Sequence, residues 1–176
     1  MNWYKTSQQI YRGDPNPITM QEYNPEYGIK NLGKQLGSSL AEGPGIYFTT
    51  KEDEAKGYGE NVSKFNLNNA NILTSQSKKF SYRQIDKIVS EVDKETLEGA
   101  ALNWNENYNI GKKLLIESIT ANENPIEQLM GIWADVFYHQ HPSQFMELMT
   151  RNGIDGIAIT QRESTHYVIY NRNLLK

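Results

Sequence analysis

Hydrophobic residues occur in short runs near both ends of the chain and at helical spacing in the middle. The runs near the ends are continuously apolar or alternate with polar positions, and glycine, proline or asparagine lies beside them, as is typical of β-strands. The runs that predict strands are residues 9–13, 46–48, 62–67, 72–74, 154–160 and 167–170. Residues 68–71, Asn-Asn-Ala-Asn, separate two of these runs and predict a loop.

The middle of the chain predicts helices from its apolar spacing and from its capping residues. The predicted helices cover residues 81–92, 94–104 and 112–120, with two more beginning at Pro125 and Pro142. Ser81 and Gln84 have the spacing of a capping box, in which each side chain bonds the other residue's backbone N–H. Pro125 and Pro142 suit first turns because that position needs no backbone donor. Trp104 is expected on the inward face of its helix.

A further short helix is predicted directly after the strand at residues 46–48. Thr50 can accept backbone N–H groups as an N-cap. The acidic residues Glu52 to Glu54 suit the positive end of the helix dipole. We therefore assign these acidic side chains to helix stabilisation and not to catalysis.

Together these elements predict an α+β fold in a single domain of residues 1–176. Strands from both ends of the chain are expected to pair through long-range contacts. The helices of residues 81–152 are expected to form an inserted block or a cap. Residues 18–41 carry three glycines among polar residues and predict an irregular or partly helical loop. This loop belongs to a longer segment, residues 14–42, whose glycines permit closure over a ligand.

Composition mainly excludes certain kinds of site and certain classes of protein. The 176 residues carry a net charge of -3 with acids and bases interspersed, so no basic stripe indicates long nucleic acids. The absence of cysteine excludes disulfides, thiolate metal sites and cysteine nucleophiles. The first residues lack the apolar core of a signal peptide, and no apolar run reaches membrane-spanning length. We expect a cytoplasmic protein, of the producing cell or of a host cell, without a membrane partner.

No metal site is predicted. His139 and His141 lie one residue apart at a predicted helix end, without a nearby set of carboxylates. Zinc sites in proteins need three or four protein ligands. We interpret these two histidines as solvated residues.

Three short motifs point to chemistry: Tyr11-Arg12-Gly13, then Gly43 to Phe48 followed by Tyr58, and finally His166 to Asn171. In order, relative position and residue type they resemble the ADP-ribosyltransferase superfamily, which includes the diphtheria-toxin-like and poly(ADP-ribose) polymerase branches. The closing run also resembles transferase domains of phage and mobile-element polyproteins. The resemblance covers roughly residues 8–70 and 148–176. It implies split antiparallel sheets with the helical block 81–152 inserted between them or covering them.

The resemblance implies an enzyme that uses NAD as a substrate. It would transfer ADP-ribose to a protein or nucleic-acid acceptor and release nicotinamide. Breaking the bond between nicotinamide and ribose develops positive charge on the ribose. The site must therefore hold the nicotinamide flat, anchor the phosphates and stabilise an oxocarbenium-like state. No metal or second cofactor is implied.

Roles for individual residues also follow from the resemblance. Backbone groups of Gly13 would grip the carboxamide, and Tyr47 and Tyr58 would sandwich the nicotinamide ring. Arg12 would contact phosphate or ribose, because a guanidinium suits bidentate phosphate contact. Phe48 would pack behind the site. The implied NAD-binding residues are Tyr11, Arg12, Gly13, Gly45, Tyr47, Phe48 and Tyr58.

The chain departs from the family at the third motif, where His166 stands in place of the usual catalytic glutamate. That carboxylate accepts a hydrogen bond from a ribose hydroxyl and offsets the developing positive charge. A neutral imidazole can accept the hydrogen bond but carries no negative charge, and an imidazolium would oppose the developing positive charge. Glu163 lies three residues earlier and can supply the carboxylate if its loop curls inward. The predicted catalytic residues are Arg12, Tyr47, His166 and Glu163.

Other interpretations of the same residues stay open. His166 favours a transferase-like module without chemistry, which would bind NAD, ADP-ribose or a partner protein. A phage or mobile-element interaction protein could instead dock a host factor through residues 81–152. Independently of these functions, Arg12 could be a surface strand residue, and Tyr47 and Tyr58 could be core aromatics with wet hydroxyl ends. His166 would be a hydrogen-bonded strand histidine.

Overall fold

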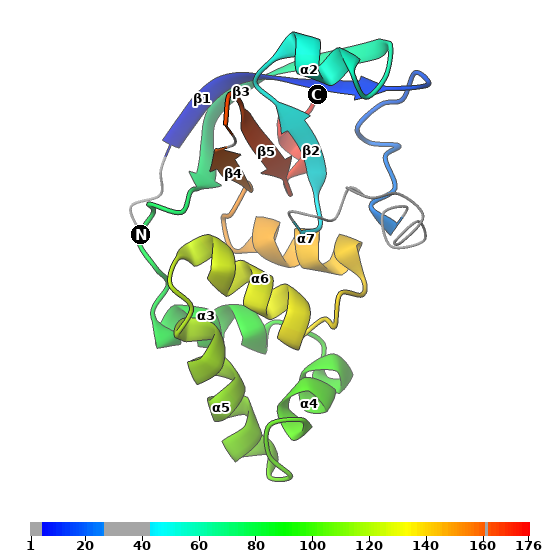
Figure 1. Cartoon of the computed structure of the whole chain (residues 1–176). Helices are drawn as coiled ribbons and strands as arrows, with labels where there is room; N and C mark the ends of the chain where they lie inside the picture. Colours follow the sequence, from blue (N-terminus) through cyan, green and yellow to red (C-terminus); the bar gives the residue numbers. More distant parts are fainter. Residues whose placement is uncertain (1–4, 27–42, 161) are drawn as a thin grey trace. The chain divides into compact units, whose positions relative to one another are not determined.

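The computed structural model describes residues 5–26, 43–160 and 162–176 (Figure 1). The described elements are β1 (Lys5–Asp14), β2 (Ile46–Thr49), α2 (Glu52–Lys56), β3 (Asn61–Leu73), α3 (Tyr82–Ser90), α4 (Lys94–Leu102), α5 (Tyr108–Thr120), α6 (Pro125–Asp135), α7 (Pro142–Arg151), β4 (Gly156–Thr160), β5 (Thr165–Ile169) and the 3₁₀ turn η1 (Arg172–Leu174). The chain divides into two compact units. One unit comprises Met1–Thr74 and Pro142–Lys176, and the other comprises Ser75–His141.

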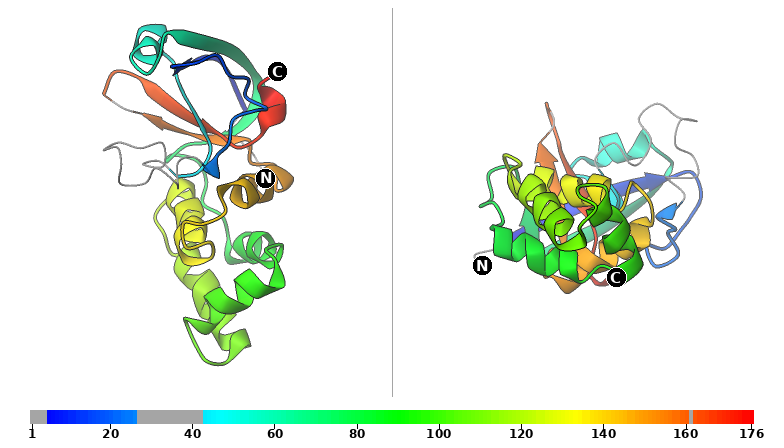
Figure 2. Two further views of the ribbon diagram at one scale, coloured as in Figure 1. Left: turned by 90° about the vertical axis from the view of Figure 1, so that its right-hand side faces the viewer. Right: turned by 90° about the horizontal axis from the view of Figure 1, so that it is seen from below.

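The described strands of the first unit close into a barrel in the order β1-β2-β5-β4-β3 (Figures 1 and 2). Neighbouring strands are antiparallel except for β3 and β4, which run parallel. Closure places β2 between β1 and β5, so a strand from the start of the chain is paired with a strand near its end. The barrel therefore brings residues that are distant in sequence onto neighbouring strands.

Apolar side chains from every strand of the barrel are buried. Fully buried examples, one from each strand, are Ile10, Ile46, Ile72, Ile157 and Val168. Burying a side chain of this size contributes about 1.5–3 kcal/mol to folding. β-Branched residues suit these positions because they pack well on a pleated surface. The core thus fixes the positions of β1, β2 and β5, which carry the three motifs.

The expected α+β class is confirmed, whereas the expected split antiparallel sheets are not. The described strands form one closed barrel that includes a parallel pair. The predicted loop at residues 68–71 is wrong, because β3 runs through it and Ala70 pairs with Thr6. The ladder has a register shift between Thr6 and Gln8, and Asn69 has a φ of 51°. Asparagine tolerates this left-handed conformation, so the strand continues past the irregularity.

The start of α2 differs from the expected cap. Lys51 is the N-cap residue and makes no side-chain capping bond. The hydroxyl of Thr50 instead accepts the backbone N–H of Thr165, at 3.2 Å. Thr50 therefore links β2 to β5, a contact that local sequence cannot reveal.

The predicted starts of α3, α4, α6 and α7 agree with the structure, whereas α5, predicted from residue 112, begins at Tyr108. Ser81 and Gln84 form the expected capping box of α3, and Pro125 lies in the first turn of α6. Trp104, expected to face inward, lies beyond the end of α4 with 39% of its surface exposed. Much of the predicted loop at residues 18–41, and of the segment 14–42, lies outside the described residues.

Helix α7 belongs to the unit that contains the strands, so the separate helical unit ends at His141 and not at residue 152. The aromatic ring of Phe145 in α7 meets that of Tyr170 edge to face, with 5.7 Å between ring centroids. The backbone N–H of Ile154 also bonds the carbonyl of Met149, at 3.0 Å. These contacts attach α7 to the C-terminal strands.

Candidate functional site

The three motifs lie on three neighbouring strands. Tyr11 of β1 is paired with Thr49 of β2, and Thr49 is paired with His166 of β5. Arg12 reaches across to β2, where its Nη1 donates a hydrogen bond to the carbonyl of Tyr47, at 3.2 Å. The fold therefore gathers the predicted residues Arg12, Tyr47 and His166 into one region of the barrel.

Asp14 and the ring of Tyr23 hold the side chain of Arg12 in place. Its Nε and Nη2 donate to the carboxylate of Asp14 at 2.9–3.2 Å. The guanidinium carbon lies 4.7 Å from the centre of the Tyr23 ring, a cation–π distance. The side chains of Arg12 and Asp14 are only 15% and 12% exposed. Arg12 is therefore not a solvated surface residue, and an anionic ligand that reaches it must compete with Asp14.

The second motif forms a tight turn that is fixed by backbone geometry. Gly43 and Gly45 have positive φ values of 89° and 143°. A Cβ atom on Gly45 would lie 2.4 Å from Cγ1 of Val168, so the turn requires glycine to lie against β5. The hydroxyl of Tyr47 donates a hydrogen bond to the carbonyl of Gly43. The ring of Tyr47 is thereby oriented by its own turn.

The other residues of the predicted NAD-binding set are spread around this region. Tyr58 is 67% exposed, which leaves its ring accessible. Phe48 is buried and meets Phe65 edge to face at 5.7 Å, so it packs in the core behind β2. The hydroxyl of Tyr11 donates to Oε1 of Gln9 at 2.6 Å. The roles of these residues toward NAD stay predictions.

Gly13 has a structural explanation. A Cβ atom at this position would lie 1.8 Å from the carbonyl oxygen of Ala55 in α2. Only glycine permits α2 to approach β1 so closely. This contact also sets the position of α2, and with it the position of the acidic side chain that precedes Ala55.

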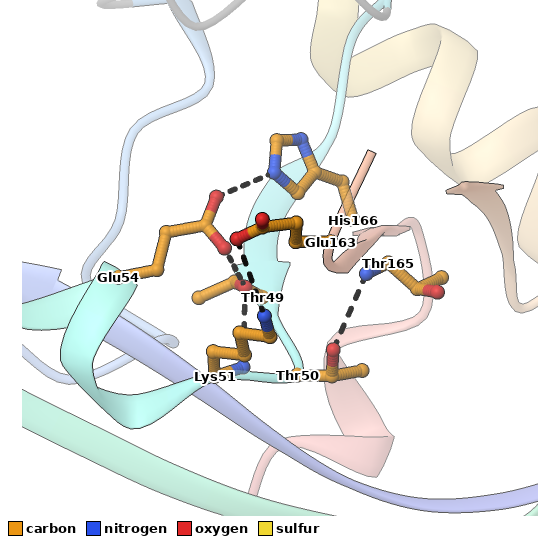
Figure 3. A network of polar contacts seen from close by, with 7 residues as sticks. All are labelled: Thr49, Thr50, Lys51, Glu54, Glu163, Thr165 and His166. Atoms are coloured by element: carbon orange, nitrogen blue, oxygen red, sulfur yellow. Dashed lines mark hydrogen bonds and ion pairs between the residues drawn. The ribbon is translucent and has the colours of Figure 1, made fainter. Parts of the chain in front are cut away.

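That side chain, Glu54, contacts His166 (Figure 3). Its Oε1 lies 2.8 Å from Nε2 of His166, and its Oε2 accepts a hydrogen bond from Oγ1 of Thr49, also at 2.8 Å. The Thr49 hydroxyl in turn accepts the backbone N–H of Lys51, at 3.2 Å. An ionised carboxylate has only acceptor atoms, so His166 donates Nε2–H to it. His166 is therefore a hydrogen-bonded strand histidine, as one interpretation expected, and its partner is a carboxylate.

The environment favours the charged form of Glu54. Partial burial alone would raise the pKa of its carboxyl group. Hydrogen bonds from Ser164, Thr49 and His166, together with the charge of His166, outweigh burial and hold the pKa below its ordinary value. Glu54 thus presents a negative charge on a side chain that is only 28% exposed.

Glu163, the other carboxylate predicted for this role, lies near the same residues but is much more exposed than Glu54. Its side chain is 88% exposed, and its carboxylate lies 4.0 Å from Nζ of Lys51. The sequence assigns the acidic residues of this helix to the helix dipole and gives no local sign that Glu54 lies beside His166.

A cavity of about 710 Å³ lies in the same unit. It is lined by residues 21 and 23–25, by one side of α7 and by residues 170–173. Tyr23 belongs to this lining and also covers the Arg12 guanidinium. The hydroxyl of Tyr170, another lining residue, is buried and has no hydrogen-bond partner among the described residues. The volume is typical of small-molecule sites.

Two negative findings apply to the described part of the chain. None of its helices is long and apolar enough to cross a membrane. None of its clusters of histidine and acidic residues could hold a metal ion. In particular, His139 and His141 both have positive φ, at 56° and 59°, and they are not part of such a cluster among the described residues.

Comparisons with known proteins give one structural similarity. No family model and no curated protein matches the chain. A solved structure described as the crystal structure of an anti-CRISPR protein is similar over 96% of this chain and 93% of that chain. The two sequences are 13% identical, and the TM-score is 0.37.

Proposed function

We propose that this protein is an NAD-dependent ADP-ribosyltransferase, which transfers ADP-ribose to a protein or nucleic-acid acceptor and releases nicotinamide. One observation carries the proposal. The three motifs that resemble the family are far apart in sequence, yet they lie on the adjacent strands β1, β2 and β5.

The groups in this region suit the charges of the proposed substrate. NAD carries a negative pyrophosphate beside a ribose on which positive charge develops. Arg12 provides a planar cation for the phosphates, once it exchanges Asp14 for the ligand. The exposed ring of Tyr58 and the ring of Tyr47 are the candidates for stacking on nicotinamide. The cavity beside Tyr23 offers volume for the rest of the nucleotide.

The test is release of nicotinamide from NAD by the purified protein, with and without cell lysate. We expect Tyr47→Ala to abolish release, whereas Tyr47→Phe, which keeps the ring and loses the bond to Gly43, retains most of it. Tyr82→Ala is the matched control, because Tyr82 is an exposed tyrosine of α3. A lysate requirement would indicate a macromolecular acceptor. Release that is equal in Tyr47→Ala and wild type would contradict the assignment of the site.

A second candidate function is a binding module for NAD or ADP-ribose without chemistry. The specific observation in its favour is that position 166 carries histidine, where the resemblance places a catalytic glutamate. Isothermal titration with ADP-ribose distinguishes the two functions. Saturable binding that is lost in Arg12→Gln, together with no nicotinamide release by the wild type, would favour the module.

A further inference from the structure

We infer that Glu54 supplies the catalytic carboxylate of this site and that His166 positions it. This inference rests on the proposed function and names the residue that performs the charge stabilisation. The carboxylate comes from α2, directly after the second motif, and not from the third motif. The supporting observations are the geometry of Glu54, its charge and the different environments of the other nearby carboxylates.

The geometry fixes both oxygens of the carboxylate. His166 on β5 holds Oε1 at 2.8 Å, and Thr49 at the end of β2 holds Oε2 at 2.8 Å. The contact of Gly13 with Ala55 fixes the approach of α2 itself. A carboxylate that is held by two strands needs little reorganisation during a reaction, and such preorganisation is the main source of electrostatic catalysis. The remaining lone pairs of the two oxygens can accept a further bond from a ligand.

The side chain combines charge with access. Its pKa lies below the ordinary value, so it is ionised at neutral pH. With 28% of the side chain exposed, Glu54 is shielded from much of the solvent and still reachable by a ligand. A partly desolvated negative charge interacts more strongly with a developing cation than a solvated one does.

Other carboxylates of this region are engaged differently. Asp14 accepts three hydrogen bonds from Arg12, and Glu163 is 88% exposed beside Lys51. Glu52 is 53% exposed and pairs with Lys56 within α2. Asp14 faces Arg12, and Glu163 and Glu52 are more exposed than Glu54, so of these four carboxylates Glu54 alone is both partly shielded and bonded to His166.

The reaction balances without a further reagent. The bond between C1′ of the ribose and the nicotinamide nitrogen breaks, and its electron pair leaves with nicotinamide, which departs uncharged. Glu54 accepts a hydrogen bond from a ribose hydroxyl and offsets the positive charge at C1′. A lone pair of the acceptor then forms the new bond to C1′, and the acceptor's proton passes to water. His166 acts only through Glu54, by donating Nε2–H to it.

The experiment compares nicotinamide release and NAD affinity in four proteins. Relative to wild type, Glu54→Gln should lower kcat by about 100-fold, the usual effect of removing one preorganised electrostatic group, with little change in affinity. His166→Gln should lower kcat by about tenfold, because the carboxylate remains and only its position is lost. Glu52→Gln, the matched control on the same helix, should leave kcat within about twofold of wild type, because its surface ion pair is weak.

Each outcome decides a different claim. A wild type that releases no nicotinamide overturns the proposed function, and the role of Glu54 falls with it. An active wild type with an equally active Glu54→Gln overturns the role of Glu54 alone, and loss of activity in Glu163→Gln instead would assign the role to Glu163. If Glu54→Gln does not fold, nicotinamide release by Glu54→Asp tests the role of Glu54 instead. This variant keeps the charge but moves it by about one carbon–carbon bond, so full activity in it would refute a fixed carboxylate.

Discussion

Replacing His166 with glutamate introduces the residue that ADP-ribosyltransferases carry in the third motif, yet the structure predicts that the substitution destabilises this protein. The new carboxylate would face Glu54, whose Oε1 now lies 2.8 Å from the imidazole Nε2. Two unit charges about 4 Å apart repel by about 4 kcal/mol at an effective dielectric constant of about 20. Because both side chains are about one quarter exposed, solvent screening reduces this repulsion to about 1–2 kcal/mol.

A second loss adds to the repulsion. The substitution removes a hydrogen bond to a charged acceptor, and a bond of this kind contributes about 1.5–3 kcal/mol when it is well shielded. We use the lower end of this energy range because the Glu54–His166 contact is partly exposed. The free energy of unfolding of His166→Glu should therefore fall by about 2–4 kcal/mol at neutral pH. His166→Gln loses the imidazole without adding charge, so it should lose only about 1–2 kcal/mol.

The assay is urea unfolding of both variants and wild type at pH 7.5 and pH 4. Acidic pH protonates one of two adjacent carboxylates, which removes the repulsion. The difference in free energy of unfolding between His166→Glu and His166→Gln should therefore be smaller at pH 4 than at pH 7.5. Equal stability of the two variants at pH 7.5 would refute the placement of Glu54 beside position 166. A gain of nicotinamide release in His166→Glu would refute the catalytic role given to Glu54.

Three further predictions concern stability. Gly13→Ala should lower the free energy of unfolding by about 2–3 kcal/mol in urea titrations, because its Cβ would lie 1.8 Å from a backbone oxygen of α2. Gln128→Leu should lower it by about 2–4 kcal/mol, because the fully buried amide bonds three backbone groups of Phe80 and Thr120. The lowered pKa of Glu54 stabilises the fold above the unfolded-state pKa of about 4.3, and this contribution is lost as the pH falls through the folded-state pKa. The stability difference between wild type and Glu54→Gln should therefore stay constant above about pH 5 and shrink below about pH 4, as circular dichroism at a series of pH values can show.

Local signals predicted the helices well. A capping box needs only residues three apart, and Ser81 with Gln84 marks the start of α3 correctly. Pro125 marks α6 for a similar local reason. Cap residues, however, have alternative partners in a folded protein. Thr50 was expected to cap α2 but bonds Thr165, on a segment more than one hundred residues away.

Pairing between distant strands accounts for most of what the sequence left undetermined. The run of asparagines at residues 68–71 has turn composition, but the ladder with β1 keeps it in β3. The contact of Glu54 with His166 spans 112 positions and exists only because β2 pairs with β5. Motifs in the sequence singled out Arg12, Tyr47 and His166. They did not single out Glu54, because a carboxylate in a first helical turn has an adequate local explanation.

The two polar contacts of the site, Arg12 with Asp14 and Glu54 with His166, suggest an order of events under the proposed function. Arg12 is neutralised by Asp14, and Glu54 accepts from His166, so each functional charge has a protein partner before a ligand arrives. The pyrophosphate of NAD is already charged on binding and can displace Asp14 from Arg12 at once. The ribose acquires its positive charge only as nicotinamide leaves, so Glu54 gains a new electrostatic partner only in the transition state. Arg12 should therefore govern NAD affinity and Glu54 the rate of release, a division that Arg12→Gln and Glu54→Gln make measurable as separate changes in Kd and kcat.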